Sequence, residues 1–244
     1  MPVDLELVLA ADVSGSVDST DFALQRDGYE AAFRDASLIS KIAGGSIGSI
    51  AATLVYWSDS AVQSVGWTRS VTPRRPMRLP NAIAAAGRPS SGSTGMTNAL
   101  NFSAGLFAND FEGSREVIDV SGDGSESVAC SFSNPSCVPL QDARDAFLAG
   151  GDDRTINALW IDDRNFFGDD SVDTINALAY GDTNVIGGPG HFQDIVQDFP
   201  EFGAAILRKL EREVTSDPVP APGVLTLFGF GLLGLAFASR RRTG

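Results

Sequence analysis

The chain has 244 residues, 43% of them hydrophobic and 20% charged, which is enough for one globular domain with a full core. Its formal net charge is −13, and we find no basic cluster before the extreme C-terminus. Because nucleic acids are bound by cationic faces, we expect no nucleic-acid partner. An acidic surface fits a cation-binding or a secreted protein.

The first predicted strand, at 3–11, is rich in Val and Leu and too short for an ordinary helix, as is typical of a buried parallel strand. It runs directly into Asp12-Val-Ser14-Gly-Ser16. Ligand sites of open α/β sheets form at this carboxyl end of a strand. One carboxylate and two hydroxyls offer only oxygen, which hard cations prefer. The same residue types are also common in a turn that caps a helix.

The later elements are predicted from hydrophobic spacing, with a period near 3.6 for helices and short β-branched runs for strands. In chain order they are a helix at 18–40, strands at 47–57 and 61–67, a short helix at 81–86, a helix at 98–108, a strand at 115–121, a helix at 140–149, a strand at 155–161, a short helix at 173–180, a strand at 184–186 and a helix at 191–214 that is interrupted or restarted at Pro200. This alternation predicts an α/β fold with a doubly wound, mostly parallel, Rossmann-like sheet flanked by helices. The strand at 61–67 is expected as an antiparallel edge strand.

Two further loops offer hard oxygen ligands. The hydroxyl-rich loop at 90–97 contains Thr94, and Asp123 lies in an acidic turn after the strand at 115–121. If these strands share one parallel sheet, their carboxyl ends share one edge and the loops meet there. A loop at 162–173 holds five aspartates but lacks the Asp-x-Asp-x-Asp-Gly spacing of a calcium loop, so we expect it to be solvated.

Two cysteines, Cys130 and Cys137, lie in one polar loop without a neighbouring His or third Cys, which argues against zinc. We expect a disulfide and therefore an oxidising compartment, with two free thiols as the alternative. His191 is the only histidine, and it is expected to cap a helix or face solvent. A Ser-His-Asp triad cannot be built without it.

The composition changes near the C-terminus. Residues 215–222 form a Pro-rich linker, and residues 223–238 carry no charge and precede Ser239 and three arginines. A helix of that length spans roughly 24 Å, which is short of the roughly 30 Å hydrocarbon core. It can still insert with local thinning and Arg snorkelling. The positive-inside rule then places the arginines in the cytoplasm.

The Asp-x-Ser-x-Ser loop, a distant Thr94 and a distant Asp123 together resemble the metal-ion-dependent adhesion site (MIDAS) of von Willebrand factor A-type domains. Three further strings, at 117–124, 185–190 and 207–213, resemble a bacterial family of such domains whose function is not defined. The resemblance covers 3–214, and we assign 1–214 to one von Willebrand factor A-like domain.

The resemblance implies a ligand set for Mg²⁺, with Mn²⁺ or Ca²⁺ as alternatives. Hydroxyls of Ser14, Ser16 and Thr94 bind the ion directly, while Asp12 and Asp123 hold its waters. Counting back from Ala99-Leu100 selects Thr94, and Thr97 is the second candidate. The ion stays under-neutralised, so that a carboxylate of an acidic protein ligand or surface component can complete its coordination shell.

The expected function is therefore metal-dependent binding or adhesion at the cell surface or in the extracellular matrix. One alternative is a surface protein in which the metal serves only stability. The other is a metal-dependent hydrolase. We find no positioned general base, no second Asp adjacent to Asp12 and no P-loop Lys, so we expect no enzyme.

The tail resembles a PEP-CTERM sorting signal, with Val-Pro-Ala-Pro at 219–222, an apolar span and an Arg cluster within 223–244. The resemblance implies an extracytoplasmic protein, at the cell surface or secreted, whose residues 223–239 contact the membrane transiently before removal. Such proteins begin with a secretory signal peptide. Here Met1 lies two residues from the first strand, so we expect a start codon further upstream. A mature-like chain and a chain that is not exported are the alternatives.

Overall fold

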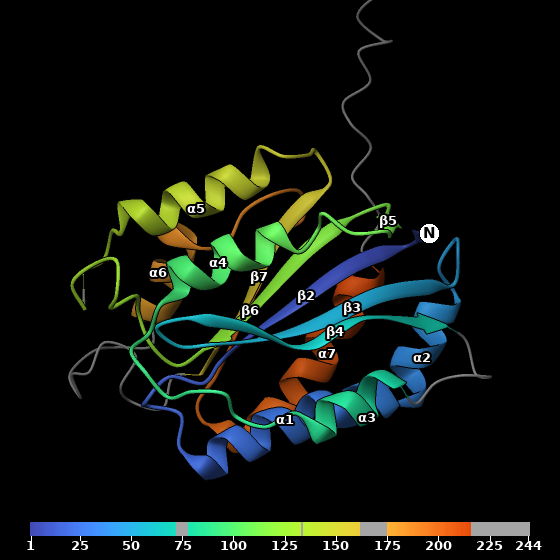
Figure 1. Ribbon diagram of the computed structural model, residues 1–244, viewed down its shortest axis with the longest axis horizontal. Coiled ribbons are helices and arrows are strands. Elements are labelled where there is room, and N and C mark those ends of the chain that lie inside the picture. The colour runs from blue at the N-terminus through green and yellow to red at the C-terminus, as the bar shows by residue number, and fades with distance from the viewer. Residues whose placement is uncertain (72–77, 133, 162–174, 216–244) are drawn as a thin grey trace, which may run out of the picture.

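The computed structural model describes residues 1–71, 78–132, 134–161 and 175–215, and within them a six-stranded sheet forms the middle of three layers (Figure 1). The strand order is β4-β3-β2-β6-β7-β8. The strands are β2 (Leu5–Asp12), β3 (Ser49–Trp57), β4 (Ala61–Val71), β6 (Glu116–Gly122), β7 (Arg154–Ile161) and β8 (Gln193–Val196). The edge strand β4 pairs antiparallel with β3, and the other pairs are parallel. The predicted fold class is confirmed.

Helices cover both faces of this sheet (Figure 1). One face carries α1 (Ser19–Arg34), α2 (Ala36–Ala43), α3 (Arg78–Ala85) and α7 (Phe202–Thr215), with a 3₁₀ turn at Phe199–Glu201. The other face carries α4 (Met96–Gly105), α5 (Val138–Leu148) and α6 (Ile175–Asn184). A two-stranded parallel sheet of β1 (Pro2–Val3) and β5 (Glu112–Gly113) lies beside them. Two hydrophobic cores therefore sandwich the sheet.

The central strand β2 explains this arrangement, because all of its residues are buried. Leu5, Leu7 and Leu9 join the core beneath α1 and α7, whereas Val8 and Ala10 join the core beneath α4 and α5. Successive side chains of a strand point to opposite faces, so a run without alternation fills both cores. The strand ends at Asp12, and the carboxyl ends of its parallel neighbours lie along the same edge.

The single helix predicted at 18–40 is wrong, because the structure has two helices, α1 and α2, with a break at Asp35. Asp35 has extended backbone (ψ 133°), and its side chain accepts a hydrogen bond from the Ser37 backbone N–H at 2.7 Å. An Asp that satisfies a free N–H in this way starts a new helix. The aromatic residues on α1 are buried against the sheet as expected.

The last strand and last helix also differ from the prediction. Residues 184–186 form no strand of the sheet, and the residue that follows them, Gly187, makes only an isolated bridge to Ile156. The sixth strand is instead β8, at Gln193–Val196, which pairs parallel with β7. The chain reaches it through Gly188 and Gly190, whose φ angles are +89° and +68°. Because residues 193–196 pair with β7, no helix runs from 191, and α7 begins at Phe202.

His191 is exposed, as one of its expected roles required, and its ring Nδ1 lies 2.7 Å from the Gly188 carbonyl oxygen. It caps no helix of the described chain. Among the described ranges, no helix is both long and apolar enough to cross a membrane. The loop at 162–173 and the segments assigned to the linker (from 216 on) and the sorting signal lie outside the described residues.

We predict that Gly28→Ala lowers the free energy of unfolding by about 1–3 kcal/mol, because overpacking is destabilising. A Cβ at Gly28 on α1 would lie 2.9 Å from Phe202 Cδ1 and 3.1 Å from Gly203 Cα on α7. Gly105, also helical, has no atom within 4 Å of an added Cβ, so Gly105→Ala is the matched control. It should raise stability by roughly 0.5–1 kcal/mol. Equal effects of the two variants in urea unfolding would contradict this packing.

Candidate metal site

The loop after β2 is folded around the carboxylate of Asp12. This side chain is fully buried, and its Oδ1 accepts a hydrogen bond from the Ser14 backbone N–H at 2.7 Å. The hydroxyl oxygens of Ser14 and Ser16 lie 3.1 Å apart. Ser14 is buried and Ser16 is exposed, so the loop leads from the interior to the surface. Three oxygen-bearing side chains thus gather at the carboxyl end of the central strand.

The loop after β6 joins this group through Asp123. The hydroxyl of Ser16 donates to Asp123 Oδ1 at 2.8 Å, although the two residues are 107 positions apart in the sequence. The parallel pairing of β2 with β6 places Ala11 beside Ser121, so both strands end at the same level. The structure therefore brings together Asp12, Ser14, Ser16 and Asp123, as the sequence led us to expect of their loops.

Charge in this group is unbalanced. Burial raises the pKa of Asp12 well above its usual range, and the charge of Asp123 raises it further. The hydrogen bond from Ser14 and the charge of Arg88 act in the opposite direction but are smaller. Asp12 Oδ2 is buried without a hydrogen-bond partner among the described residues. A Cβ added at Gly122 would lie 3.2 Å from this oxygen, so glycine keeps the space around it open.

These residues fit a hard divalent cation. A buried carboxylate oxygen without a partner is costly, and a cation relieves both that cost and the repulsion between two carboxylates. The donors are carboxylate and hydroxyl oxygens, which suit Mg²⁺, Mn²⁺ or Ca²⁺. In the described part of the chain, no three His, Cys, Asp or Glu side chains gather as a metal-binding group. A metal here would depend on hydroxyls in addition to its two carboxylates.

Both candidate threonines lie where loops meet. The backbone N–H of Thr94 donates to Ser127 Oγ at 3.0 Å, and its carbonyl accepts from the Ser127 N–H at 2.8 Å. In the same loop, the Gly92 carbonyl accepts from the Gly15 N–H at 2.8 Å. The Thr94 loop is therefore tied to both the Asp12 loop and the loop after Asp123. Thr97 lies in the first turn of α4, and its buried Oγ1 has no hydrogen-bond partner among the described residues.

Arg88 supports the Asp12 loop, and the sequence analysis missed it. Its Nη2 donates to the carbonyl oxygens of Val13 and Ser14 at 2.9 and 2.7 Å. The guanidinium thus fixes the backbone directly after Asp12. Its positive charge partly offsets the negative charge of the Asp12 carboxylate. A single Arg in a loop has no spacing signal, so only the folded chain could identify this role.

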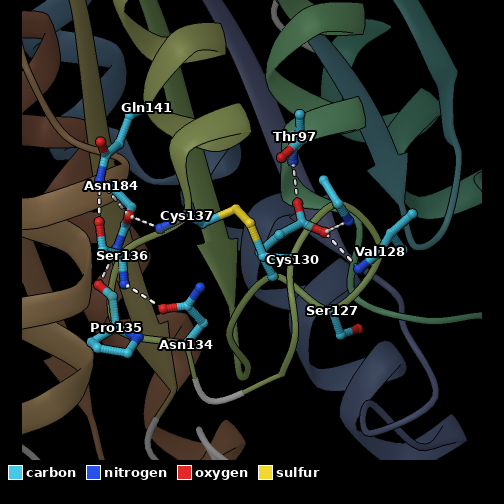
Figure 2. The surroundings of a disulfide bond; sticks show 12 residues. Thr97, Ser127, Val128, Cys130, Asn134, Pro135, Ser136, Cys137, Gln141 and Asn184 are labelled. Atoms are coloured by element: carbon cyan, nitrogen blue, oxygen red, sulfur yellow. Dashed lines mark hydrogen bonds between the residues drawn. A yellow bond between two sulfur atoms is a disulfide. The ribbon is translucent and has the colours of Figure 1, made fainter.

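Glu126 is a second supporting residue that the sequence analysis missed. Its side chain is 1% exposed, and its Oε1 accepts from the backbone N–H groups of Val128 and Ala129 at 2.7 and 3.0 Å. Its Oε2 accepts from the Thr97 N–H at 2.6 Å, at the start of α4 (Figure 2). A carboxylate that accepts three N–H groups at a helix N-terminus is strongly held. Glu126 therefore joins the loop after β6 to the loop that carries the threonines.

The disulfide expected between Cys130 and Cys137 is present, with their Cα atoms 5.8 Å apart (Figure 2). Buried Asn184, at the end of α6, anchors the same loop. Its Oδ1 accepts from the Cys137 N–H at 2.8 Å, and its Nδ2 donates to the Pro135 carbonyl at 3.0 Å. The loop that follows Asp123 is therefore closed covalently and fixed to the neighbouring helix.

A cavity of about 390 Å³ lies at the opposite end of the sheet. Asp4, at the start of β2, and Arg115, before β6, are among its lining residues. The candidate metal ligands end the same two strands, so the cavity is not part of this site.

We predict that the double variant Cys130→Ser with Cys137→Ser lowers the free energy of unfolding by about 2.5 kcal/mol, because the short loop regains its freedom in the unfolded chain. Urea unfolding measures this, and reduced wild-type protein is the control, which should match the variant. In protein recovered from an oxidising compartment, the two thiols should resist alkylation until they are reduced. Free labelling of both would contradict the disulfide.

We predict that Glu126→Ala lowers the free energy of unfolding by about 3 kcal/mol, since three N–H groups, of which that of Thr97 is buried, lose a charged acceptor. The control is Glu30→Ala, which removes an ion pair with Arg34 on the surface of α1. Its cost should stay below about 1 kcal/mol. Similar losses for the two variants would show that Glu126 does not hold the loops together.

Comparisons with known proteins agree with this fold. A model of the family described as "Protein of unknown function (DUF1194)" matches residues 2–218. No curated protein matches the chain in sequence. The pilus adhesin SpaC from Lactobacillus rhamnosus GG superposes with a TM-score of 0.61 at 14% identity, over 87% of this chain and 30% of the adhesin.

Two further solved structures show the same likeness. A von Willebrand factor type A protein from Catenulispora acidiphila has a TM-score of 0.59 at 13% identity, over 88% of this chain and 44% of its own. Proximal thread matrix protein 1 from the mussel byssus, solved with a zinc-occupied MIDAS motif, has a TM-score of 0.58 at 11% identity, over 86% of this chain and 46% of its own. The chain thus spans less than half of each of these proteins. At these identities the likeness shows the fold, which is of the von Willebrand factor A type.

Proposed function

This chain belongs to the family described as "Protein of unknown function (DUF1194)", and from its site we propose that it is a metal-dependent binding module. The observation that carries the proposal is the meeting of the Asp12 and Asp123 loops around a buried carboxylate oxygen that lacks a hydrogen-bond partner. The fold supports it, because one structural neighbour holds zinc in a MIDAS motif and another is a pilus adhesin.

In this proposal Asp12, Ser14, Ser16, Asp123 and one threonine hold a single Mg²⁺, with Mn²⁺ or Ca²⁺ as substitutes. When bound, the ion would supply a positive charge that the neutral hydroxyls in direct contact with it would not balance. An acidic group of a partner can therefore complete its coordination. Two further residues position the donors. Arg88 holds the backbone of the Asp12 loop, and Glu126 joins the loop after Asp123 to the start of α4.

The proposed partner is an acidic protein or a surface component. The disulfide fits an oxidising compartment, so we place the protein outside the cytoplasm. The sorting role of residues 215–244 belongs to the same proposal and rests on the sequence alone. In the alternative role the metal serves only stability. Retention on carboxylated beads, described below, distinguishes this role from adhesion.

Hydrolysis is the less favoured alternative. The described residues at the site are Asp, Ser, Thr, Gly and an Arg whose guanidinium is bonded to backbone carbonyls, and none of them is a His or Lys. The single histidine is bonded to Gly188 in another loop. A turnover assay on generic phosphoesters with Mg²⁺ tests this alternative directly.

We predict that Mg²⁺ raises the melting temperature, because the loops that would bind it meet only in the folded state. At a hundredfold excess over its dissociation constant, the ion should stabilise the fold by about 2.7 kcal/mol. For a domain of this size the rise is roughly 5–10 °C. Asp12→Ala and Asp123→Ala should abolish the rise while costing little stability in EDTA, where the two carboxylates repel each other. Thr94→Ala and Thr97→Ala, compared in the same scan, identify the threonine that binds.

The control is Asp27→Ala, because Asp27 is exposed on α1 and forms a surface ion pair with Arg26. Its melting temperature should rise with Mg²⁺ as in the wild type. Retention on carboxylated beads in Mg²⁺, but not in EDTA or on amide-blocked beads, then supports adhesion over a purely stabilising metal. A wild-type melting curve unmoved by millimolar Mg²⁺, Mn²⁺ or Ca²⁺ would reject the proposal.

A further inference from the structure

A second group of charges lies inside the core, away from the metal site. Lys209 on α7 is fully buried, and its Nζ makes ion-pair contacts with Asp119 Oδ1 on β6 and with Glu213 Oε1 on the same helix. The distance to Glu213 Oε1 is 2.7 Å. Asp119 is fully buried and Glu213 is 1% exposed. An amine and two carboxyl groups are therefore in contact where water is excluded.

The surroundings of this triad do not balance its charge. Asn157 Nδ2 donates to Glu213 Oε1 at 3.2 Å, and the Phe192 ring lies 5.5 Å from Lys209 Nζ. Asp119 Oδ2 and Glu213 Oε2 have no hydrogen-bond partner among the described residues. One ammonium thus faces two carboxyl groups with unsatisfied oxygens, and buried charges in this state cost free energy.

The positions of the protons decide which groups of the triad can react. Burial and then the charge of Glu213 raise the pKa of Asp119 to about 8, so at neutral pH this carboxyl group holds a proton. Burial lowers the pKa of Lys209, but the two neighbouring carboxyl groups raise it by more, so the amine keeps its proton until Glu213 takes it. A carboxylic acid, an ammonium group and a carboxylate that can accept its proton thus lie within contact distance.

We propose that Lys209 and Asp119 condense into an amide that joins α7 covalently to β6. Glu213 takes a proton from the Lys209 ammonium, and the free amine attacks the Asp119 carboxyl carbon. The N–C bond forms, the C–OH bond breaks, and the hydroxyl leaves as water with a second proton from the nitrogen. The products are one amide, one water molecule and a protonated Glu213, so atoms and charge balance and no co-reactant is needed.

The fold supplies what this reaction lacks in solution. Two groups fixed in contact react with very high effective molarity, and a dry interior opposes the reverse hydrolysis. The condensation also removes the buried charges of Lys209 and Glu213, because the ammonium becomes part of a neutral amide and the Glu213 carboxylate becomes protonated. Glu213 acts as a proton-transfer residue, because its carboxylate contacts the amine and does not enter the bond. The proposal does not depend on the metal site.

The test is mass spectrometry of the full chain, reduced first so that the disulfide does not alter the mass, and then denatured and digested. We expect one peptide pair that contains residues 119 and 209, joined and lighter by the mass of one water molecule than its two parts. Addition of Mg²⁺ or EDTA during purification should not change it. Recovery of the two peptides separately and unmodified would overturn the proposal, whether or not any variant folds.

Variants locate the bond. Lys209→Arg and Asp119→Ala should abolish the joined peptide, whereas Asp119→Asn should lose ammonia in place of water. Glu213→Gln should slow the appearance of the bond after refolding. A water loss that persists in Lys209→Arg would show that it arises elsewhere and would overturn the assignment.

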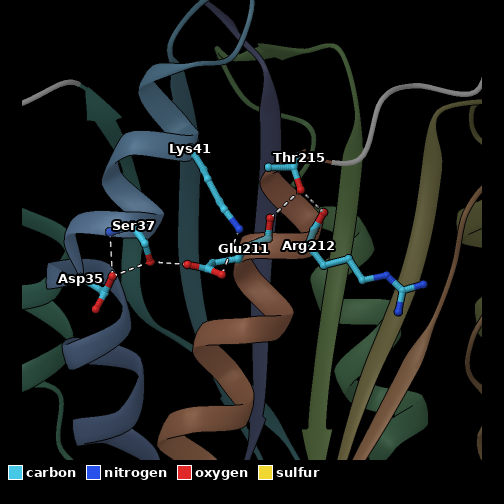
Figure 3. A network of polar contacts seen from close by, with 6 residues as sticks. All are labelled: Asp35, Ser37, Lys41, Glu211, Arg212 and Thr215. Atoms are coloured by element: carbon cyan, nitrogen blue, oxygen red, sulfur yellow. Dashed lines mark hydrogen bonds and ion pairs between the residues drawn. The ribbon is translucent and has the colours of Figure 1, made fainter.

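The matched control is the ion pair between Lys41 on α2 and Glu211 on α7, where Nζ and Oε2 are 3.0 Å apart (Figure 3). The hydroxyl of Ser37 also donates to Glu211. The amine and the carboxylate of this pair are also in contact, but water reaches them, since 39% of the Lys41 side chain is accessible. Lys41→Arg should therefore leave the joined peptide unchanged. A cross-link at Lys41 in place of Lys209 would contradict the role assigned to burial.

Discussion

The repulsion between two carboxylates at the carboxyl edge of the sheet is the constraint on which the site depends. Asp12 ends the central strand and Asp123 follows its neighbour, and the parallel register of the two strands brings them to the same level. Burial removes the water that would otherwise separate their charges, so the pKa of Asp12 rises. A strand that ends in a buried acid beside a second acid costs free energy, and a cation bound between the two acids would offset that cost.

The rest of the fold holds these groups in place. Arg88 donates to the backbone of the Asp12 loop, and Glu126 links the loop after Asp123 to the start of α4. The disulfide and Asn184 hold the loop that follows Asp123. All of these contacts except the disulfide join segments that are distant in sequence. The donors are therefore positioned before any ion arrives, which reduces the entropy that binding must overcome. The buried triad of Lys209 likewise joins distant segments, because it links α7 to β6.

The sequence predicted the features that are encoded locally. The apolar run of β2, the loop that begins at Asp12 and the short loop between Cys130 and Cys137 each carry their own pattern, and the structure has the strand, the loop and the disulfide. The break at Asp35 was missed, because α1 and α2 share one hydrophobic face while a side-chain cap decides the boundary. The strand β8 was read as helix because its apolar residues fit both periods.

The supporting contacts could not be predicted in this way. Glu126 and Lys209 are buried and Arg88 is half-buried, each in contact with a partner about 29 to 90 positions away, and no spacing rule connects them. Charged residues are ordinarily exposed, so composition predicts the wrong environment for each. Their roles depend on which strand ends meet, and that follows from the topology.

If one divalent ion binds between Asp12 and Asp123, electron paramagnetic resonance of added Mn²⁺ will detect it. We expect wild-type protein to remove one Mn²⁺ per chain from the free signal, and we expect Mg²⁺ to displace it. Asp12→Ala and Asp123→Ala should leave the free signal intact. Equal binding by these variants, or no binding by the wild type, would contradict the site.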